Sequence, residues 1–148
     1  MVESPHRLEG KNIMTNEAME FMKNNPVLYL ATVDESGNPK IRPFMFMLEK
    51  DGKPYFCTSN KKPMYAQMKN HPNVEITTAS PEFAWIRISA KISFSNDLEI
   101  KKAVIASSPL VKGIYQTAEN PDFAIFTLAD ATAVIADFSG NPPKTYRL

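Results

Sequence analysis

The segment from Thr58 to Pro63 contains residues whose types and order could bind an anion. It reads Thr58-Ser59-Asn60-Lys61-Lys62-Pro63 and lies where an apolar, strand-like stretch ends and a helical pattern begins. The first turn of a helix carries free N–H groups and a partial positive charge, and lysines beside it would neutralise a phosphate. An ordinary helix cap with two solvated lysines explains the same residues, and the segment taken alone favours this simpler interpretation.

Arg42 could give the same anion a bidentate contact. Its expected strand is followed by an Asp51-Gly52 hairpin and by the strand that ends at Thr58, and a guanidinium has the fork geometry that fits phosphate oxygens. The residues after Arg42 make both faces of its strand apolar: Pro43-Phe44-Met45-Phe46-Met47-Leu48. A helix of the same chain, a second subunit or a flat aromatic ligand would each cover the outer face.

Trp85 and Arg87 form a second group of candidate residues. They alternate with Ile86 and Ile88 and therefore point away from the apolar face of their strand. Tryptophan and arginine on the non-core side are typical of an interface or of a planar ligand site. Cys57 stands in an apolar strand, which predicts a buried and inert thiol. No residue is identifiable as a general acid, so the catalytic residues stay unassigned.

The composition excludes several classes of protein. The 148 residues carry a formal net charge of +1, which gives no reason to expect nucleic acid as a partner. The five glycines lie at least 15 residues apart, so glycine-rich phosphate loops and nucleophile elbows are excluded. One cysteine and two histidines make a metal site unexpected and indicate a reducing compartment. Without a long apolar run or a signal peptide, we expect a cytoplasmic protein with no membrane span.

Hydrophobic periodicity and turn residues predict the organisation of the chain. We expect residues 1–13 to be a disordered or non-native leader and residues 14–148 to form a single domain. Strands are expected at Val27–Val33, Lys40–Glu49, Pro54–Thr58, Asn73–Ala79 and Ala84–Phe94, with Phe123–Leu128 and Ala131–Phe138 as a strand pair or one bent strand. Short helices are expected after a cap at Thr15 or Asn16, from Pro63, from a cap at Asn96 and over Pro109–Gln116, before a polar tail at Ser139–Leu148. The short connections predict a mainly β fold, an antiparallel barrel or curled sheet with peripheral helices.

Five segments occur in a specific order along the chain. They are PVLYLATV, GNPKIRPFMF, DGKPYFCTSNKKPMYAQMKNHPNVEI, WIRISAKISF and FSGNPPKTYRL. Together they resemble the FMN-binding split-barrel family related to pyridoxamine 5'-phosphate oxidase, especially its small nitroimidazole-resistance-like branch. The resemblance implies a six-stranded antiparallel split barrel that forms a homodimer and holds two FMN molecules at the subunit interface.

The resemblance also assigns roles to the candidate residues. It implies that side chains hold the FMN phosphate, namely those of Arg42, Thr58, Ser59 and Lys62, with Asn60 and Lys61 beside it. Backbone groups would edge the isoalloxazine ring at Pro43, Phe44 and Met45, and the partner subunit would bring Trp85 and Arg87. Related oxidases have Ser-x-Lys or Ser-Arg-Lys where this chain has Thr-Ser-Asn-Lys-Lys. The choice between Lys61 and Lys62 therefore stays open.

Two functions are consistent with these residues. The first is an FMN-dependent oxidoreductase in which flavin N5 exchanges hydride with an unknown small molecule. The alternative is an FMN-binding electron carrier or flavin-storage protein without an organic substrate. Open space over the reactive face of the flavin would favour the enzyme, and a covered face would favour the carrier.

Overall fold

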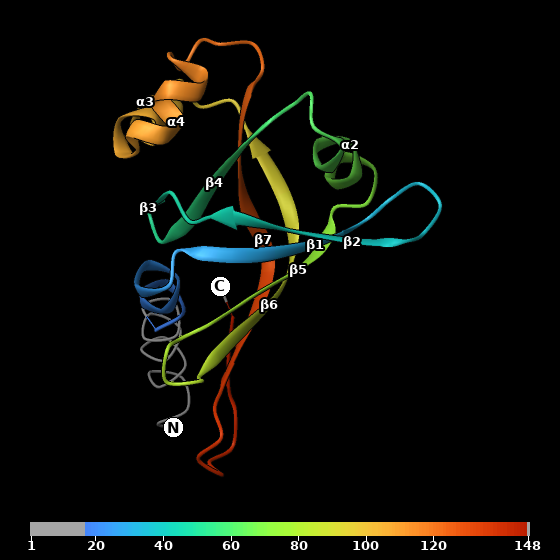
Figure 1. Cartoon of the computed structure of the whole chain (residues 1–148), viewed down its shortest axis with the longest axis vertical. Helices are drawn as coiled ribbons and strands as arrows, with labels where there is room; N and C mark the ends of the chain where they lie inside the picture. The colour runs from blue at the N-terminus through green and yellow to red at the C-terminus, as the bar shows by residue number, and fades with distance from the viewer. Residues whose placement is uncertain (1–16, 148) are drawn as a thin grey trace, which may run out of the picture.

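A computed structural model of the chain describes residues 17–147 (Figure 1). The expected leader, residues 1–13, and the expected cap at Thr15 or Asn16 lie outside this range. Residues 17–24 are helical. The elements that follow are β1 (Val27–Val33), β2 (Pro39–Met45), β3 (Leu48–Lys50), β4 (Lys53–Ser59), α2 (Pro63–Asn70), β5 (Asn73–Ala79), β6 (Trp85–Ser95), α3 (Leu98–Ser107), α4 (Pro109–Tyr115), β7 (Phe123–Ala136) and β8 (Lys144–Arg147).

The strands of the described residues form one curled antiparallel sheet. Their order is β2-β1-β5-β6-β7-β4-β3, and β8 pairs with β7. The six strands of seven or more residues make the split barrel, while the short β3 and β8 extend it. The expected fold class, a mainly β protein with a six-stranded antiparallel split barrel and peripheral helices, is confirmed. Helices α3 and α4 lie together at one end of the sheet (Figure 1).

The helices of residues 17–147 are short. Helices α2 and α4 begin at Pro63 and Pro109, where a missing N–H costs nothing because the first turn leaves that donor unpaired. Helix α3 has ten residues. No helix in this part of the chain is long and apolar enough to cross a membrane.

The pairing of β1 with β2 sorts their side chains into an inner and an outer face. Leu28 lies opposite Phe44 and Leu30 lies opposite Arg42, and the three apolar members of these pairs are buried. Tyr29 and Met45 belong to the outer face and remain 44% and 42% exposed. Because a strand alternates its side chains, a one-residue shift in register would move Arg42 to the outer face.

Strand β4 separates two hydrophobic clusters. On one side, the Phe56 ring lies 4.8 Å from the Phe44 ring and 5.4 Å from the Phe126 ring, measured between centroids, in the barrel interior. On the other side, Tyr55 packs in a cluster with Val104 and other residues of α3 and α4. Burying one such side chain contributes about 1.5–3 kcal/mol. The position of β4 is therefore fixed from both faces.

The residues Phe46 and Met47 close the barrel. A single strand was expected over Lys40–Glu49, but β2 ends at Met45 and β3 begins at Leu48. The Phe46 N–H donates to the Pro26 carbonyl at 2.9 Å and the Met47 N–H donates to the Tyr55 carbonyl at 3.0 Å. The chain thus changes its pairing partner from β1 to β4, and this change breaks the strand.

The change of strand partner at Phe46 and Met47 also corrects the expectation that the strand of Arg42 pairs with the strand that ends at Thr58. Strand β2 does not pair with β4, because β4 pairs with β3 and β7. Strands β2 and β3 lie at opposite ends of the sheet order, and two residues connect them. Arg42 and Thr58 therefore approach each other through closure of the barrel and not through a hairpin ladder.

The structure also decides three expectations about the ends of elements: the cap of α3, the last apolar region and the C-terminal tail. The cap of α3 is Asp97 and not Asn96, because the Asp97 carboxylate accepts from the N–H groups of Glu99 and Ile100. The last apolar region is one strand, β7, with irregular register near Asp130, whose φ is 50°. The expected polar tail contains β8, which pairs with β7. Within β8, Tyr146 is buried and its hydroxyl hydrogen-bonds to the Glu17 carboxylate.

Candidate functional site

A cavity of about 590 Å³, called here the edge cavity, lies where β2, β4, the start of α2 and α4 meet. Six of the predicted site residues line it: Arg42, Pro43, Phe44, Met45, Thr58 and Lys62. The remaining lining residues are Met47, Cys57, Pro63, Met64, Leu110, Val111, Ile114 and Tyr115. The structure therefore brings Arg42 and Thr58, which are 16 positions apart in the sequence, to one cavity.

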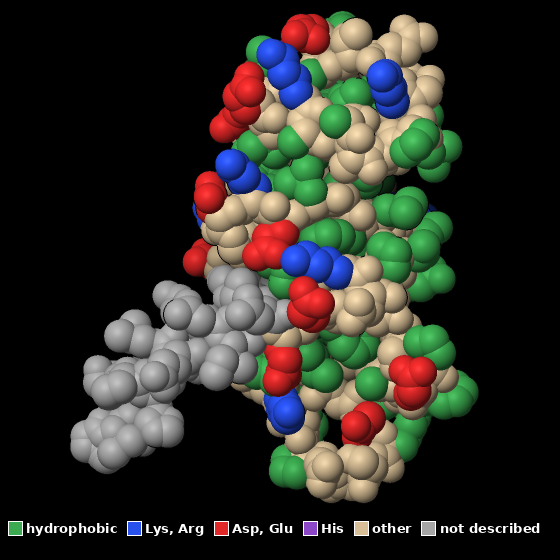
Figure 2. Space-filling view, turned by 90° about the vertical axis from the view of Figure 1, so that its left-hand side faces the viewer, with side chains coloured by type: hydrophobic (Ala, Val, Ile, Leu, Met, Phe, Trp, Pro, Cys, Tyr) green, Lys and Arg blue, Asp and Glu red, His purple; other side chains and the backbone are tan. Residues whose placement is uncertain are grey.

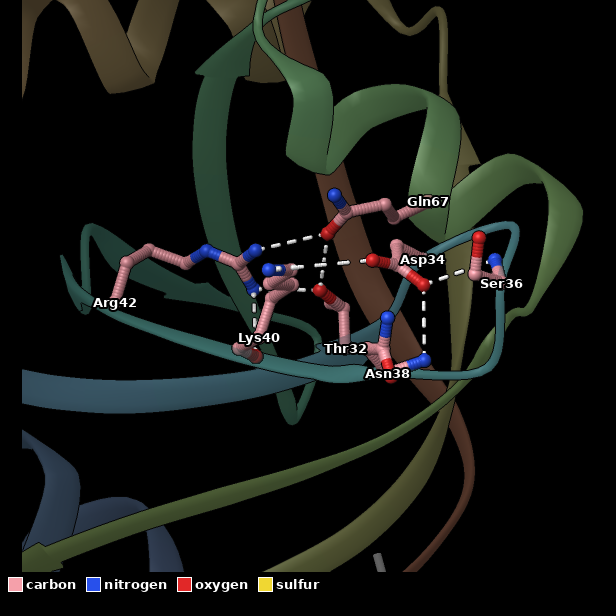
Figure 3. A network of polar contacts seen from close by, with 7 residues as sticks. All are labelled: Thr32, Asp34, Ser36, Asn38, Lys40, Arg42 and Gln67. Atoms are coloured by element: carbon pink, nitrogen blue, oxygen red, sulfur yellow. Dashed lines mark hydrogen bonds and ion pairs between the residues drawn. The ribbon is translucent and has the colours of Figure 1, made fainter.

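The Arg42 guanidinium is held between β1 and α2 (Figure 3). Its Nη1 donates to Thr32 Oγ1 at 2.7 Å and to the Leu30 carbonyl at 3.1 Å, and its Nη2 donates to Gln67 Oε1 at 2.9 Å. Partial burial lowers the pKa of Arg42, although a guanidinium stays charged at neutral pH. The wall of the edge cavity therefore contains a fixed cation.

The charge of Arg42 is not neutralised by a carboxylate of residues 17–147. Asp34 lies beside the network (Figure 3), but its carboxylate accepts from the N–H groups of Ser36 and Asn38, both at 2.9 Å. These hydrogen bonds, that of Asn38 foremost, lower the pKa of Asp34. The carboxylate therefore stabilises its own turn.

Thr58 lines the edge cavity and has a buried hydroxyl without a partner in the described part of the chain. The residue is 3% exposed, and its Oγ1 has no hydrogen-bond partner among residues 17–147. Leaving a buried hydroxyl unpaired costs about 1–3 kcal/mol, so a polar ligand atom there would be stabilising. Lys62 lines the same cavity. None of the residues that line this cavity carries a carboxylate. The polar end of the cavity therefore suits an anion.

The residues between Thr58 and Lys62 shape the turn and do not line the cavity. Ser59 Oγ accepts from the Lys61 N–H at 3.1 Å, and the Asn60 side-chain amide donates to the Pro121 carbonyl at 2.8 Å. No side chain caps α2, whose N-cap residue is Lys62. The simple-cap interpretation of this segment is therefore wrong in its detail, since the hydroxyl of Ser59 stabilises the turn before the helix.

An apolar wall faces the charged end, and sequence reasoning did not find it. Leu110 and Ile114 stand one helical turn apart on α4, line the cavity and remain 64% and 61% exposed. Met47 contributes from the β2–β3 connection and packs against the α3–α4 cluster. Helices of the same chain thus cover Met47, whereas Met45 stays 42% exposed. The i, i+4 spacing of Leu110 and Ile114 was visible in the sequence, but their exposure was not.

Trp85 and Arg87 lie outside the edge cavity, on the outer face of β6. In the sheet register, Pro43 is opposite Tyr29, Tyr29 is opposite Thr77, and Thr77 is opposite Arg87. The Trp85 ring lies 5.1 Å from the Phe138 ring between centroids. One row of outward side chains therefore links Arg87 to the edge of the cavity at Pro43, across four strands.

A second cavity, of about 700 Å³, lies elsewhere on the sheet. Its lining includes Glu75, Lys91 and Asp130 but none of the predicted site residues. No group of three or more His, Cys, Asp or Glu side chains in the described range is placed to hold a metal ion. The edge cavity is therefore the place where the predicted chemistry gathers.

The fold and the edge cavity define a split-barrel protein with a cationic pocket at its closing edge. Residues 14–133 match the family model described as pyridoxamine 5'-phosphate oxidase, and the chain belongs to this family. The expected resemblance, including that to its nitroimidazole-resistance-like branch, is confirmed. No curated protein sequence matches the chain.

Solved structures show the same architecture. A NimC/NimA family protein from Clostridium acetobutylicum is 29% identical, with 97% of this chain and 98% of that chain covered and a TM-score of 0.86. A protein from the same organism, related to general stress protein 26 of Bacillus subtilis, is 18% identical over 91% and 94% of the two chains, with a TM-score of 0.70. A pyridoxamine 5'-phosphate oxidase-related, FMN-binding protein from Nostoc punctiforme is 16% identical over 88% and 86%, with a TM-score of 0.66.

Cys57 lines the cavity as a neutral thiol. Burial raises its pKa to about 11, and the opposing effect of the Lys62 charge is smaller. We predict that iodoacetamide alkylates the folded protein at pH 8 about 100-fold more slowly than the chain unfolded in guanidinium, because the thiolate is the nucleophile. A plot of the alkylation rate against pH should still rise above pH 10. A midpoint near or below pH 9 would show that the thiol is not desolvated.

Proposed function

We propose that this protein is a cytoplasmic, homodimeric FMN-binding flavoprotein that acts as an oxidoreductase on a small molecule, with residues 14–148 as one FMN-binding domain. The observation that carries the proposal is the edge cavity, which Arg42, Lys62 and Thr58 line together with apolar residues. A flavin mononucleotide has the matching parts, a phosphate and a flat, largely apolar ring. The FMN-binding protein from Nostoc punctiforme shares the fold.

The residues of the cavity divide into two groups by their chemistry. Arg42, Lys62 and Thr58 would hold the phosphate, because a guanidinium, an ammonium and a free hydroxyl all donate hydrogen bonds to phosphate oxygens. The apolar residues would contact the ring system. When bound, FMN supplies hydride transfer at its N5. The exposure of Leu110 and Ile114 leaves this side of the cavity accessible to a small molecule, which favours an enzyme over a closed electron carrier.

The turn residues would act indirectly. Ser59 and Asn60 fix the path of the chain between β4 and α2 through their hydrogen bonds to Lys61 and Pro121. They thereby set where Lys62 stands. Of the two lysines, Lys62 lines the cavity and Lys61 does not, so we assign the phosphate contact to Lys62.

Replacing the cations should weaken FMN selectively. We predict that Arg42→Ala and Lys62→Ala each raise the Kd for FMN by about 10- to 100-fold, the value of a charge-assisted hydrogen bond. The Kd for riboflavin, which lacks the phosphate, should change less than threefold. Fluorescence titration measures both constants, and Lys61→Ala is the matched control with an expected change below threefold. Equal weakening of FMN and riboflavin would contradict the phosphate assignment.

The outer face of β1 and β2 supports the homodimer. Val27, Tyr29, Ile41 and Met45 are between 42% and 67% exposed on neighbouring positions of this face. Hydrophobic side chains are exposed along one edge of the molecule in Figure 2. An apolar patch of this kind marks an interaction site. Since the row from Pro43 to Arg87 crosses the same face, a second copy seated there would bring its own Trp85 and Arg87 toward the cavity edge.

A charge on this face should separate the subunits. We predict that light scattering during gel filtration gives the wild-type protein twice the 16.6 kDa mass of one chain, and that Tyr29→Glu gives a monomer with weakened FMN binding. Leu98→Glu is the control, since Leu98 is 41% exposed on α3, and it should remain dimeric. A wild-type monomer that retains FMN would show that FMN binding does not require a subunit interface.

A further inference from the structure

Gln67 on helix α2 accepts a hydrogen bond from Arg42, which lines the edge cavity. Its Oε1 accepts from Thr32 Oγ1 at 2.6 Å and from Arg42 Nη2 at 2.9 Å, while Thr32 Oγ1 accepts from Arg42 Nη1 at 2.7 Å (Figure 3). The three side chains therefore form a closed ring of hydrogen bonds. Thr32 is 1% exposed, so the ring lies at the boundary of the barrel interior.

The orientation of the Gln67 amide is forced by its partners. If the amide were flipped, its NH₂ group would face the guanidinium N–H groups, and two donors would meet without an acceptor. The Thr32 hydroxyl is likewise determined, because it accepts from Arg42 and donates its one proton to Gln67. Each member of the ring thus has one possible arrangement, and the guanidinium plane is fixed by it.

The ring occupies one end of the guanidinium and leaves one edge free. The two oxygens, 2.6 Å apart, face the end between Nη1 and Nη2. Nη1 also donates to the Leu30 carbonyl. Among residues 17–147 no hydrogen bond is formed by Nε, and Nη2 lies on the same side of the group as the Nε–H. The free edge therefore presents two parallel donors, the geometry that binds phosphate in a bidentate manner.

Helix α2 places both cations of the site. Lys62 is its N-cap residue, and Gln67 stands five residues further along the chain. Because Gln67 is neutral, it orients Arg42 without cancelling its charge. A carboxylate at position 67 would still accept the hydrogen bond from Arg42, but its negative charge would cancel the positive charge of the guanidinium.

We propose that Gln67, together with Thr32, is a positioning residue that aims the Nε–Nη2 edge of Arg42 at the phosphate, and so determines that the site prefers FMN to riboflavin. This inference rests on the proposed function. Its consequence is that Gln67 acts on FMN through Arg42 alone. The effect of a Gln67 substitution must then vanish when Arg42 is absent.

The test is a double-mutant cycle read by fluorescence titration with FMN and riboflavin. Gln67→Met keeps the length of the side chain but removes the acceptor, and should lower the preference for FMN over riboflavin by about tenfold. In an Arg42→Ala background, Gln67→Met should change the FMN Kd less than twofold. Gln67→Glu, which keeps the acceptor and so the fold, should lower the preference at least as much, with riboflavin binding within threefold of wild type.

Three results would overturn the inference in distinguishable ways. An unchanged preference in Gln67→Met, in a wild type that prefers FMN, removes the role of Gln67 and leaves the proposed function standing. If Gln67→Met weakens FMN binding equally in the wild type and in the Arg42→Ala background, Gln67 does not act through Arg42. Binding of neither FMN nor inorganic phosphate by the wild type, the latter followed by ³¹P line broadening, removes the proposed function and this inference together.

Discussion

The partly buried charge of Arg42 is the constraint on which the candidate site depends. Taking a guanidinium out of water is costly unless polar partners replace the lost hydration. Here a backbone carbonyl, a hydroxyl and an amide oxygen do so, from Leu30, Thr32 and Gln67. Dipoles orient the cation without neutralising it, whereas a carboxylate would neutralise it. The charge is thereby held in place and kept available to an anion, in a chain whose five glycines provide no backbone cradle for phosphate.

The barrel supplies the other half of the site through its closure. Since Phe46 and Met47 carry the chain from the β1 side of the sheet to β4, Arg42 on β2 comes to share a cavity with Thr58 on β4. The packing of β4 between two hydrophobic clusters fixes Thr58. The second cluster also seats α4, which brings Leu110 and Ile114 to the opposite wall. The closure of the barrel thus places the charged end of the cavity, and the second cluster places its apolar end.

Much of the fold follows from local signals in the sequence. The alternation in β6 and the Asp51-Gly52 turn predicted strands and hairpins that the structure contains. Residue types pointed to Arg42, Thr58 and the Lys61-Lys62 pair, of which only Lys62 lines the edge cavity. The break at Phe46 could not be predicted, because a change of strand partner is a long-range property. Gln67 was missed for a similar reason, since a glutamine on a short helix is an ordinary surface residue until the register of β1 and β2 places Thr32 and Arg42 against it.

If the edge cavity holds FMN, the purified protein carries this flavin or binds it when it is added. The absorption spectrum of the purified, desalted protein, with the mass of any chromophore released by denaturation, tests this proposal most directly. We expect flavin absorption bands and a released molecule with the mass of FMN, or, for protein isolated without its cofactor, saturable binding of added FMN at one site per chain. A colourless protein that binds no FMN on titration would contradict the proposal.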